Sequence, residues 1–252
     1  MNNGKPETTD TVVKQDQELL ASITRLMPLD LIPNDYKQEL IGSPVKLRTV
    51  LTKAFVPAIS VVVGKDEAAI KDWWVKFYQK YFNLKVDLSA VKIPDYQEGF
   101  DWVIIIAQSL TISQVLKALK RYMKVYLYKD NLSDKDVPTN DRDAKNGSYA
   151  VRFRKRVEAD EELKNYSAND LKENNVVGIT LLERLIMELA YFEETDGKHL
   201  DINNWTLCSG SRYSGGVVPR VHWSPGRDGL CVDWAVLGDA HVYLRARAAV
   251  SC

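Results

Sequence analysis

The chain has 252 residues and carries 34 basic and 34 acidic side chains, so its formal net charge is zero. This length can bury a sizeable core in one or two domains, and the balanced charge argues against a general nucleic-acid binder. The sequence has neither a basic and then apolar signal segment nor an apolar run near the length of a membrane span. We therefore expect no nucleic-acid or membrane partner, and a cytoplasmic protein or one exported without a signal peptide.

The first quarter of the chain predicts a polar tail followed by helices. Residues 1–14 are polar and are expected to form a disordered tail. Apolar spacing predicts helices over Gln15–Met27, Asp35–Ile41, Val45–Val56 and Asp66–Tyr81. The last of these carries a stripe that is typical of a buried packing face rather than of a ligand site. The stripe consists of Ile70, Trp73, Trp74, Phe77 and Tyr81.

Three further segments predict a small α/β module. Val103–Ala107 is an apolar run typical of a buried strand, Ser113–Met123 has helical spacing, and Val125–Tyr128 indicates a second strand. These segments contain no glycine-rich phosphate loop, so we do not expect nucleotide binding. Residues 15–130 are therefore predicted to form an N-terminal helical and α/β module with a structural role, such as oligomerisation.

A polar, turn-rich stretch over 130–147 indicates a loop. Its Asp134, Asp141 and Asp143 lack the glycine and the terminal glutamate of a calcium-binding loop, so a solvated loop is the favoured interpretation. Regular structure is predicted to resume with one strand and two helices, over Ser148–Arg154, Glu158–Asn165 and Thr180–Thr195.

The composition changes after Lys198. From there to the end the chain has no Lys, Glu, Gln or Met, whereas the preceding residues contain 21, 13, 7 and 4 of them. At the same frequency, about a dozen residues of these four types would be expected in 199–252. A β-rich subdomain explains part of the bias. Randomisation of AAC codons at both adenines would explain more of the bias, since codons that end in C never encode Lys, Glu, Gln, Met or Trp. Such codons permit Asn, Thr, Ile and Phe, which are also missing after Thr206, so both interpretations stay open.

Alternating side chains divide the last stretch into two faces, because successive residues of a strand point to opposite sides. Along one segment, the pattern predicts a buried face with Leu230, Val232 and Trp234 and an exposed face with Cys231 and Asp233. Two further segments alternate in the same way, with Arg220 and His222 beside Val221 and Trp223, and with Arg245 and Arg247 beside Leu244 and Ala246. The codon-permitted residues thus form an exposed surface over an apolar core.

Five segments of the second half carry a family resemblance. They are Asn-Gly-Ser-Tyr-Ala-Val-Arg-Phe (146–153), Arg-Val-Glu-Ala-Asp-Glu-Glu-Leu-Lys (156–164), Gly-Ile-Thr-Leu-Leu-Glu-Arg (178–184), Gly-Lys-His-Leu-Asp-Ile-Asn-Asn-Trp-Thr-Leu-Cys-Ser-Gly-Ser-Arg (197–212) and Leu-Arg-Ala-Arg-Ala-Ala-Val-Ser (244–251). Together they resemble the target proteins of diversity-generating retroelements, particularly variable proteins of candidate-phyla bacteria and nanoarchaea. The resemblance covers about Val137 to Ser251, nearly half of the chain.

This resemblance implies a C-type lectin fold whose exposed variable residues bind a ligand. It also implies an error-prone reverse transcriptase, encoded elsewhere, that rewrites those positions from a template repeat. The resemblance treats Arg245 and Arg247 as fixed, so we expect at least one of them to be held by a charge-assisted hydrogen bond.

The sequence therefore predicts an α+β fold, in which a C-type lectin-like domain over 131–252, with a variable region over 207–251, follows the small α/β module. The predicted function is diversified ligand binding without catalysis, and the expected ligand is a protein. The candidate contact residues are Tyr213, Arg220, His222, Ser224, Arg227, Asp228, Asp233, Asp239, His241 and Tyr243.

Two other functions stay open: an undiversified interaction or structural protein, and an oxidoreductase like the formylglycine-generating enzymes. Those enzymes share the lectin-like fold and use paired cysteines as copper ligands, for which this chain offers only Cys208 and Cys231 as an internal pair. Because Cys231 lies at a codon-permitted position, the enzyme is the less favoured interpretation.

We expect no metal and no cofactor. The three cysteines are odd in number and show no metal-ligand spacing, which favours a reduced compartment. His222 and His241 lie in a loop-rich context that favours exposed ligand contacts over a metal or acid–base site. Val218-Pro219-Arg220 stands where sugar-binding lectins have Glu-Pro-Asn or Gln-Pro-Asp, so calcium-dependent sugar binding is not expected.

Overall fold

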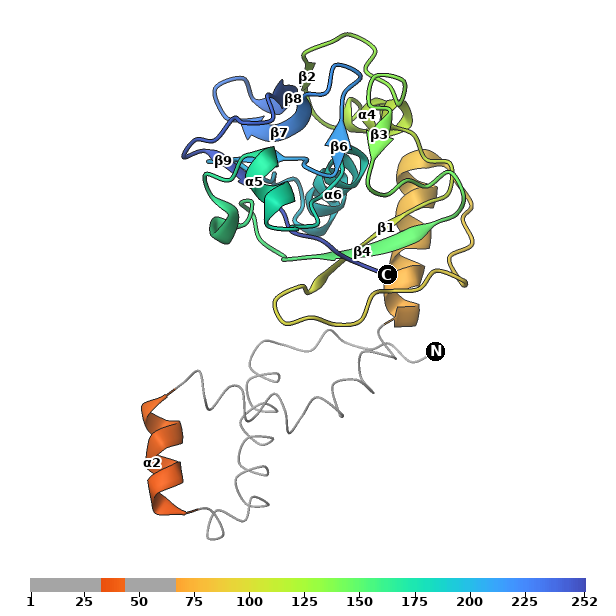
Figure 1. Cartoon of the computed structure of the whole chain (residues 1–252). Coiled ribbons are helices and arrows are strands. Elements are labelled where there is room, and N and C mark those ends of the chain that lie inside the picture. Colours follow the sequence, from red (N-terminus) through yellow and green to blue (C-terminus); the bar gives the residue numbers. More distant parts are fainter. Residues whose placement is uncertain (1–32, 44–66) are drawn as a thin grey trace, which may run out of the picture. The chain divides into compact units, whose positions relative to one another are not determined.

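The computed structural model describes residues 33–43 and 67–252 (Figure 1). The chain divides into two compact units, residues 1–64 and 65–252. The second unit combines helices with mainly antiparallel sheets, which confirms the α+β class. Within the described ranges, no helix is long and apolar enough to cross a membrane.

Only one helix of the first unit can be compared with the predictions. Helix α2 (Asn34–Gly42) confirms the helix predicted over Asp35–Ile41. The predicted tail over 1–14 and the helices predicted over Gln15–Met27 and Val45–Val56 lie outside the described residues.

The described part of the second unit holds three sheets. Their strands are β1 (Trp102–Ile106), β2 (Val125–Leu127), β3 (Thr139–Asn140), β4 (Tyr149–Phe153), β5 (Trp205–Leu207), β6 (Ser211–Arg212), β7 (Val218–Ser224), β8 (Gly229–Ala235), β9 (Leu244–Ala246) and β10 (Val250–Ser251). The sheet orders are β1-β4-β10, β2-β8-β7-β5-β9 and β3-β6. In the five-stranded sheet β2 runs parallel to β8 and β9 parallel to β5, while its other pairs are antiparallel.

Helices of the second unit begin with strong local signals. They are the helix over 67–82, α4 (Ile112–Leu119), the short 3-10 helix η2 (Glu161–Leu163), α5 (Ala168–Glu173) and α6 (Leu181–Glu194). At the start of α4, α5 and α6, the hydroxyls of Thr111, Ser167 and Thr180 each accept a hydrogen bond from the backbone N–H three residues on. The side chain of that later residue in turn accepts a hydrogen bond from the backbone N–H of the Thr or Ser. These reciprocal bonds satisfy donors that a helix start leaves unpaired.

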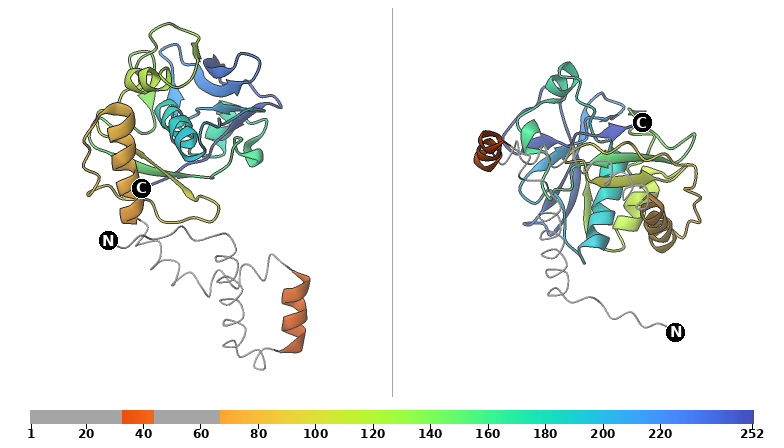
Figure 2. Two further views of the ribbon diagram at one scale, coloured as in Figure 1. Left: turned by 180° about the vertical axis from the view of Figure 1, so that it is seen from behind. Right: turned by 90° about the horizontal axis from the view of Figure 1, so that it is seen from below.

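Helix α6 lies at the centre of the second unit. It contacts β1 of one sheet and β7 of the other, and α4 packs beside it (Figures 1 and 2). The helix over 67–82 covers β1, where Trp74 Nε1 donates to the Val103 carbonyl at 3.2 Å and Tyr78 Oη donates to the Ile105 carbonyl at 2.7 Å. The aromatic stripe predicted for this helix is therefore a packing face, as expected.

The predicted boundary between modules at 130/131 is not where the structure divides. Strand β1 pairs with β4 along its whole length, and β2 pairs with β8. Both of these strands were assigned to the N-terminal module, yet each completes a sheet of the C-terminal half. Backbone hydrogen bonds across 130/131 thus join the two parts into one unit, which begins at Lys65.

The segment between β4 and α6 also differs from its prediction. A helix was expected over Glu158–Asn165, but only η2 forms there, because the carboxylates of this segment are used in tertiary contacts. Glu158 accepts hydrogen bonds from Asn203 and Asn204, and Asp160 accepts from Arg154. Helix α5, which follows η2, was not predicted.

Candidate functional site

The five-stranded sheet has two different faces. On the inner face, Val221, Trp223, Leu230 and Val232 pack into the main core around α6. Part of the outer face is covered by α5 in a second, smaller core, which includes Ala168, Leu171, Leu207, Val218, Ala235, Leu244 and Ala246. The rest of the outer face is left open, and most of the predicted contact residues belong to it.

Six residues on the open part form a cluster that we call the Trp205 patch. They are Trp205, Arg220, His222, Asp233, His241 and Tyr243. The rings of His222, His241 and Tyr243 lie with centroids 5.1, 5.0 and 6.3 Å from that of the indole. The indole belongs to β5, which lies between β7 and β9, so residues of β7 and of the loop before β9 converge on it.

Strand register explains this convergence. Thr206 pairs with Val221 and Leu207 with Arg220, so the antiparallel ladder places Trp205 across from His222. On the other side of β5, the backbone N–H of Trp205 donates to the Tyr243 carbonyl at 2.7 Å. This bond anchors the end of the 236–243 loop beside the indole. The sequence separates these side chains by up to 38 positions, and the sheet brings them together.

Arg220 and Asp233 form the polar centre of the patch. They are register partners on β7 and β8, and the carboxylate accepts from both Nε and Nη2 of the guanidinium, the latter at 3.3 Å. The guanidinium carbon lies 4.3 Å from the Trp205 ring centroid. An aspartate thus holds a cation over an aromatic face, an arrangement that fixes an otherwise flexible side chain.

His222 is the half-buried member of the patch. Burial lowers the pKa of its imidazole below 6.5, and nearby Arg220 acts in the same direction while Asp233 opposes it. The ring is therefore neutral at pH 7. Its Nδ1 is buried and has no hydrogen-bond partner among the described residues.

The β7–β8 hairpin continues the outer face away from the patch. Arg227 and Asp228 are exposed there, and Ser224 is half-buried. Asp228 pairs with Lys124 at 3.1 Å, and the Arg227 guanidinium lies 5.6 Å from the Tyr126 ring. These predicted residues therefore lie on the same sheet as the patch, next to β2. Asp239 is half-buried in the 236–243 loop.

Tyr213 is a correction to the predicted contact set. Its side chain is only 4% exposed, its hydroxyl donates to the Asp233 carbonyl at 3.3 Å, and its ring packs edge-on against Tyr128. Burial raises the pKa of this phenol. Tyr213 is thus part of the scaffold beneath β8, because its position after β6 directs it inward.

Two residues of β8 also differ from the alternation argument. Trp234 was expected to be buried but is 45% exposed, because it stands at the end of β8, beyond the part of the inner face that the main core covers. Cys231 was expected to be exposed but is buried. It lies between the register partners His222 on β7 and Tyr126 on β2, which shield it from both sides.

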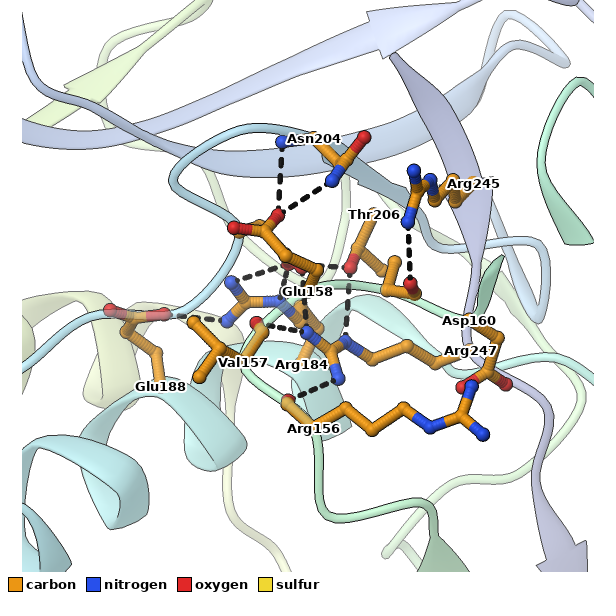
Figure 3. Close-up of polar contacts among 12 residues, drawn as sticks. Arg156, Val157, Glu158, Asp160, Arg184, Glu188, Asn204, Thr206, Arg245 and Arg247 are labelled. Carbon is orange, nitrogen blue, oxygen red and sulfur yellow. Dashed lines mark hydrogen bonds and ion pairs between the residues drawn. The ribbon is translucent and has the colours of Figure 1, made fainter. Parts of the chain in front are cut away.

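Beneath the sheet lies a buried polar network that the sequence reasoning did not predict (Figure 3). Asp201 accepts from Arg184 Nε at 2.9 Å, from Arg247 Nη2 at 2.6 Å and from the Thr206 hydroxyl at 2.5 Å. Arg184 also donates to Glu188 at 2.8 Å. Two guanidinium groups and two carboxylates thus neutralise one another out of contact with water.

Backbone carbonyls complete this network. Arg247 Nη1 and Nη2 donate to the carbonyls of Arg156 and Val157 at 3.0 and 2.8 Å. Complete burial acts to raise the pKa of Asp201, but the guanidinium groups of Arg247 and Arg184, together with the Thr206 hydroxyl, hold this pKa below its usual value. Every hydrogen bond of Arg247 therefore ties strand β9 and its continuation to distant segments of the chain.

The expectation for the two C-terminal arginines is confirmed. Arg247 is held by Asp201, and Arg245 forms an ion pair with Glu161. The alternation argument, however, placed Arg247 on an exposed face, which is wrong because a buried acidic partner was available 46 positions earlier. Asp201, Thr206 and Arg247 all lie in the segments that carry the family resemblance, and this shared location was the available signal for the network.

The cysteines show no paired arrangement. Cys208 packs in the main core, while Cys231 lies on the outer face of β8, and both are free thiols. Burial raises the pKa of each thiol. Across the described ranges, no group of three or more His, Cys, Asp or Glu residues is placed to hold a metal ion.

Comparisons with known protein families, with curated proteins and with solved structures found no match for this chain.

Proposed function

We propose that this protein is a diversified ligand-binding protein, the target of a diversity-generating retroelement, built on a C-type lectin-like scaffold. The observation that carries the proposal is the division of the five-stranded sheet. Its open outer face gathers Arg220, His222, Asp233, His241 and Tyr243 around one tryptophan, and each of these five is codon-permitted.

The fixed part of the scaffold supports the same proposal. Apart from Glu188, the residues of the buried polar network come from 156–164, 178–184, 197–212 and 244–251, which are segments of the family resemblance. A diversification system requires that exchangeable side chains do not carry the fold. Here the network and the inner-face core stabilise the sheet from one side, and the variable side chains lie on the other.

The order of elements is compatible with the lectin-like scaffold. Two helices, α5 and α6, lie between the early strand β4 and the late β region from β5 to β10. Strand β4 pairs with β10, so the proposed domain closes on itself near its C-terminal end. This order of elements is what the proposal requires of a lectin-like domain.

A protein surface is the ligand class that the patch favours. Tyr243 and Val242 are 57% and 53% exposed, and Val236 and Leu237 extend the exposed apolar surface along the 236–243 loop. Exposed aromatic and aliphatic side chains around an arginine are typical of protein-binding surfaces. The open face also offers Tyr and Arg, which contribute large contact area and forked hydrogen bonds.

The test is the DNA beside the gene. We expect a near-copy of its 3′ end that differs from the gene almost only at adenines, close to a reverse-transcriptase gene. The differing codons should be those for the outer-face and loop residues of 220–243, and the codons for Asp201, Thr206 and Arg247 should be identical in both copies. If a near-copy is absent, or if it differs equally at every base, the proposal of diversification is wrong.

A further inference from the structure

A cavity of about 530 Å³ lies apart from the Trp205 patch, between α5 and the turn before β6. Its lining includes Arg212, Lys172, Ser209, Asn175 and Asp141, and none of the six patch residues. The backbone at Gly210 packs closely against that at Gly178 beside the cavity. The lining brings together two cations, Arg212 and Lys172, and the unpaired hydroxyl of Ser209.

Arg212 is a half-buried cation without a carboxylate partner among the described residues. Its Nη1 donates to the carbonyls of Ser209 and Ser211 at 2.7 and 2.8 Å, which fixes the guanidinium, while Nε and Nη2 have no acceptor in the described part of the chain. Burial lowers the pKa of this guanidinium, which Asp141 partly offsets. In contrast, Arg142, Arg154, Arg220 and Arg247 each bond a carboxylate.

Ser209 adds a second unsatisfied group at the same cavity. Its Oγ is buried and has no hydrogen-bond partner in the described structure. Glycines set its position: a Cβ at Gly178 would lie 1.8 Å from this oxygen, and a Cβ at Gly210 would lie 2.7 Å from the Gly178 carbonyl. The Gly210 N–H donates to the Ile179 carbonyl at 3.0 Å, so the turn is pinned against the start of α6.

The charge around the cavity is positive. Arg212 and Lys172 contribute two cations, and Asp141 contributes one anion. A buried hydroxyl and the free edge of a fixed guanidinium are donors that match an oxyanion, because the arginine fork bonds carboxylate and phosphate oxygens in pairs. Each unpaired buried donor costs free energy that a bound oxyanion would recover.

We propose that this cavity is a binding site for a small oxyanion, a carboxylate or a phosphate group, held by Arg212 with Ser209 and Lys172. The site is separate from the Trp205 patch, because none of the six patch residues lines the cavity. It does not depend on the proposed function, and either can fail without the other.

The experiment is a titration of the full chain followed by NMR, with inorganic phosphate in one arm and acetate in the other, at constant ionic strength and pH. Saturable shifts are expected in the amide signals of 139–141, 172–177 and 209–212 in at least one arm, and the arm with the tighter binding identifies the oxyanion. Shifts that do not saturate, or that sodium chloride reproduces, would overturn the proposal.

Variants make the test specific. Arg212→Ala should weaken binding about tenfold or more, as expected for the loss of a charge-assisted pair of hydrogen bonds. Lys198→Ala, which removes an equal charge at an exposed site that does not line the cavity, should leave the affinity unchanged. If Arg212→Ala does not fold, Lys172→Ala should weaken binding a few-fold and Asp141→Asn should strengthen it. Equal affinities for the wild type, Lys172→Ala and Asp141→Asn would contradict the site.

Discussion

Two arginine–aspartate pairs of the same chemistry lie on opposite sides of one sheet. In the Trp205 patch, the side chains of Arg220 and Asp233 are 20% and 32% exposed. In the network beneath, those of Arg247 and Asp201 are 1% and 0% exposed. Water screens the Arg220–Asp233 pair and can hydrogen-bond to either partner if the other is removed. Water does not reach the Arg247–Asp201 pair, so the loss of one partner leaves a buried charge unpaired.

This difference teaches which polar residues the fold requires. Among the described residues, the Asp233 side chain bonds only Arg220, while the Asp201 carboxylate accepts hydrogen bonds from Arg184, Arg247 and Thr206 at once. The outer pair can therefore be exchanged with little effect on folding, and the inner aspartate cannot. A binding surface that tolerates replacement is thus compatible with a scaffold that does not.

The largest expected effect comes from breaking the buried network. Asp201→Asn keeps the shape of the side chain but removes the carboxylate that pairs with buried Arg247 and leaves buried Arg184 with Glu188 alone. We expect a loss of about 3–5 kcal/mol in the free energy of unfolding. Chemical denaturation at pH 7 measures this loss, with the denaturant slope checked for two-state behaviour.

Asp233→Asn is the matched control for that variant. It makes the same chemical change to the carboxylate of an Arg–Asp pair, at an exposed position. The expected cost is at most about 1 kcal/mol, as for other surface ion pairs. If the two variants were destabilised equally, the contrast between the faces would be lost.

The next comparison is between two tryptophans of neighbouring strands. Trp223 is 9% exposed and stacks on His199 with ring centroids 3.3 Å apart, whereas Trp234 is 45% exposed. Trp223→Ala should cost about 3–5 kcal/mol, as for other buried aromatics. Trp234→Ala should cost no more than about 1 kcal/mol because little surface is removed from the core. Thermal melts with the reverse order would contradict the assigned faces.

Exchange of patch residues should have a smaller effect. Arg220→Ser, His241→Asp and Tyr243→Arg each introduce another codon-permitted residue on the open face. We expect each to change stability by about 0.5 kcal/mol or less, which corresponds to about 2 °C or less in Tm. Calorimetry of the single variants checks this, and a loss above about 2 kcal/mol in any of them would show that the patch supports the fold.

The smallest expected effect is a pH dependence through His222. Its folded-state pKa is lowered by burial, so the folded state binds fewer protons than the unfolded state when the pH falls below about 6.5. This contribution to stability is present above that value and is lost as the pH falls. The fall in Tm from pH 7 to pH 5 should be smaller in His222→Asn than in the wild type by about a degree or two. An unchanged slope would mean that the ring is protonated without cost.

Local patterns in the sequence were sufficient to predict most strands and helices of the second unit. The alternation from Arg220 to Trp223 predicted the two faces of β7, and apolar spacing over Thr180–Thr195 predicted α6. These predictions succeed because strand alternation and helical spacing depend on neighbours within a few positions.

Burial at the ends of elements could not be predicted in the same way. Alternation shows which face Trp234 occupies, but only the packed structure shows where the core beneath that face ends. Arg247 is buried because Asp201 is available, and Tyr213 is buried because of the turn after β6. The domain boundary failed for the same reason, since the pairing of β1 with β4 joins residues about 47 positions apart.

The most direct test of the account compares two libraries displayed on cells. In one, Arg220, His222, Asp233, His241 and Tyr243 are randomised with codons that end in C; in the other, Arg184, Glu188, Asp201, Thr206 and Arg247 are randomised with the same codons. Resistance to protease reports the folded fraction of each library. We predict that most clones of the first library remain folded and that nearly all clones of the second do not. Similar folded fractions in both libraries would contradict the separation of an exchangeable surface from a fixed scaffold.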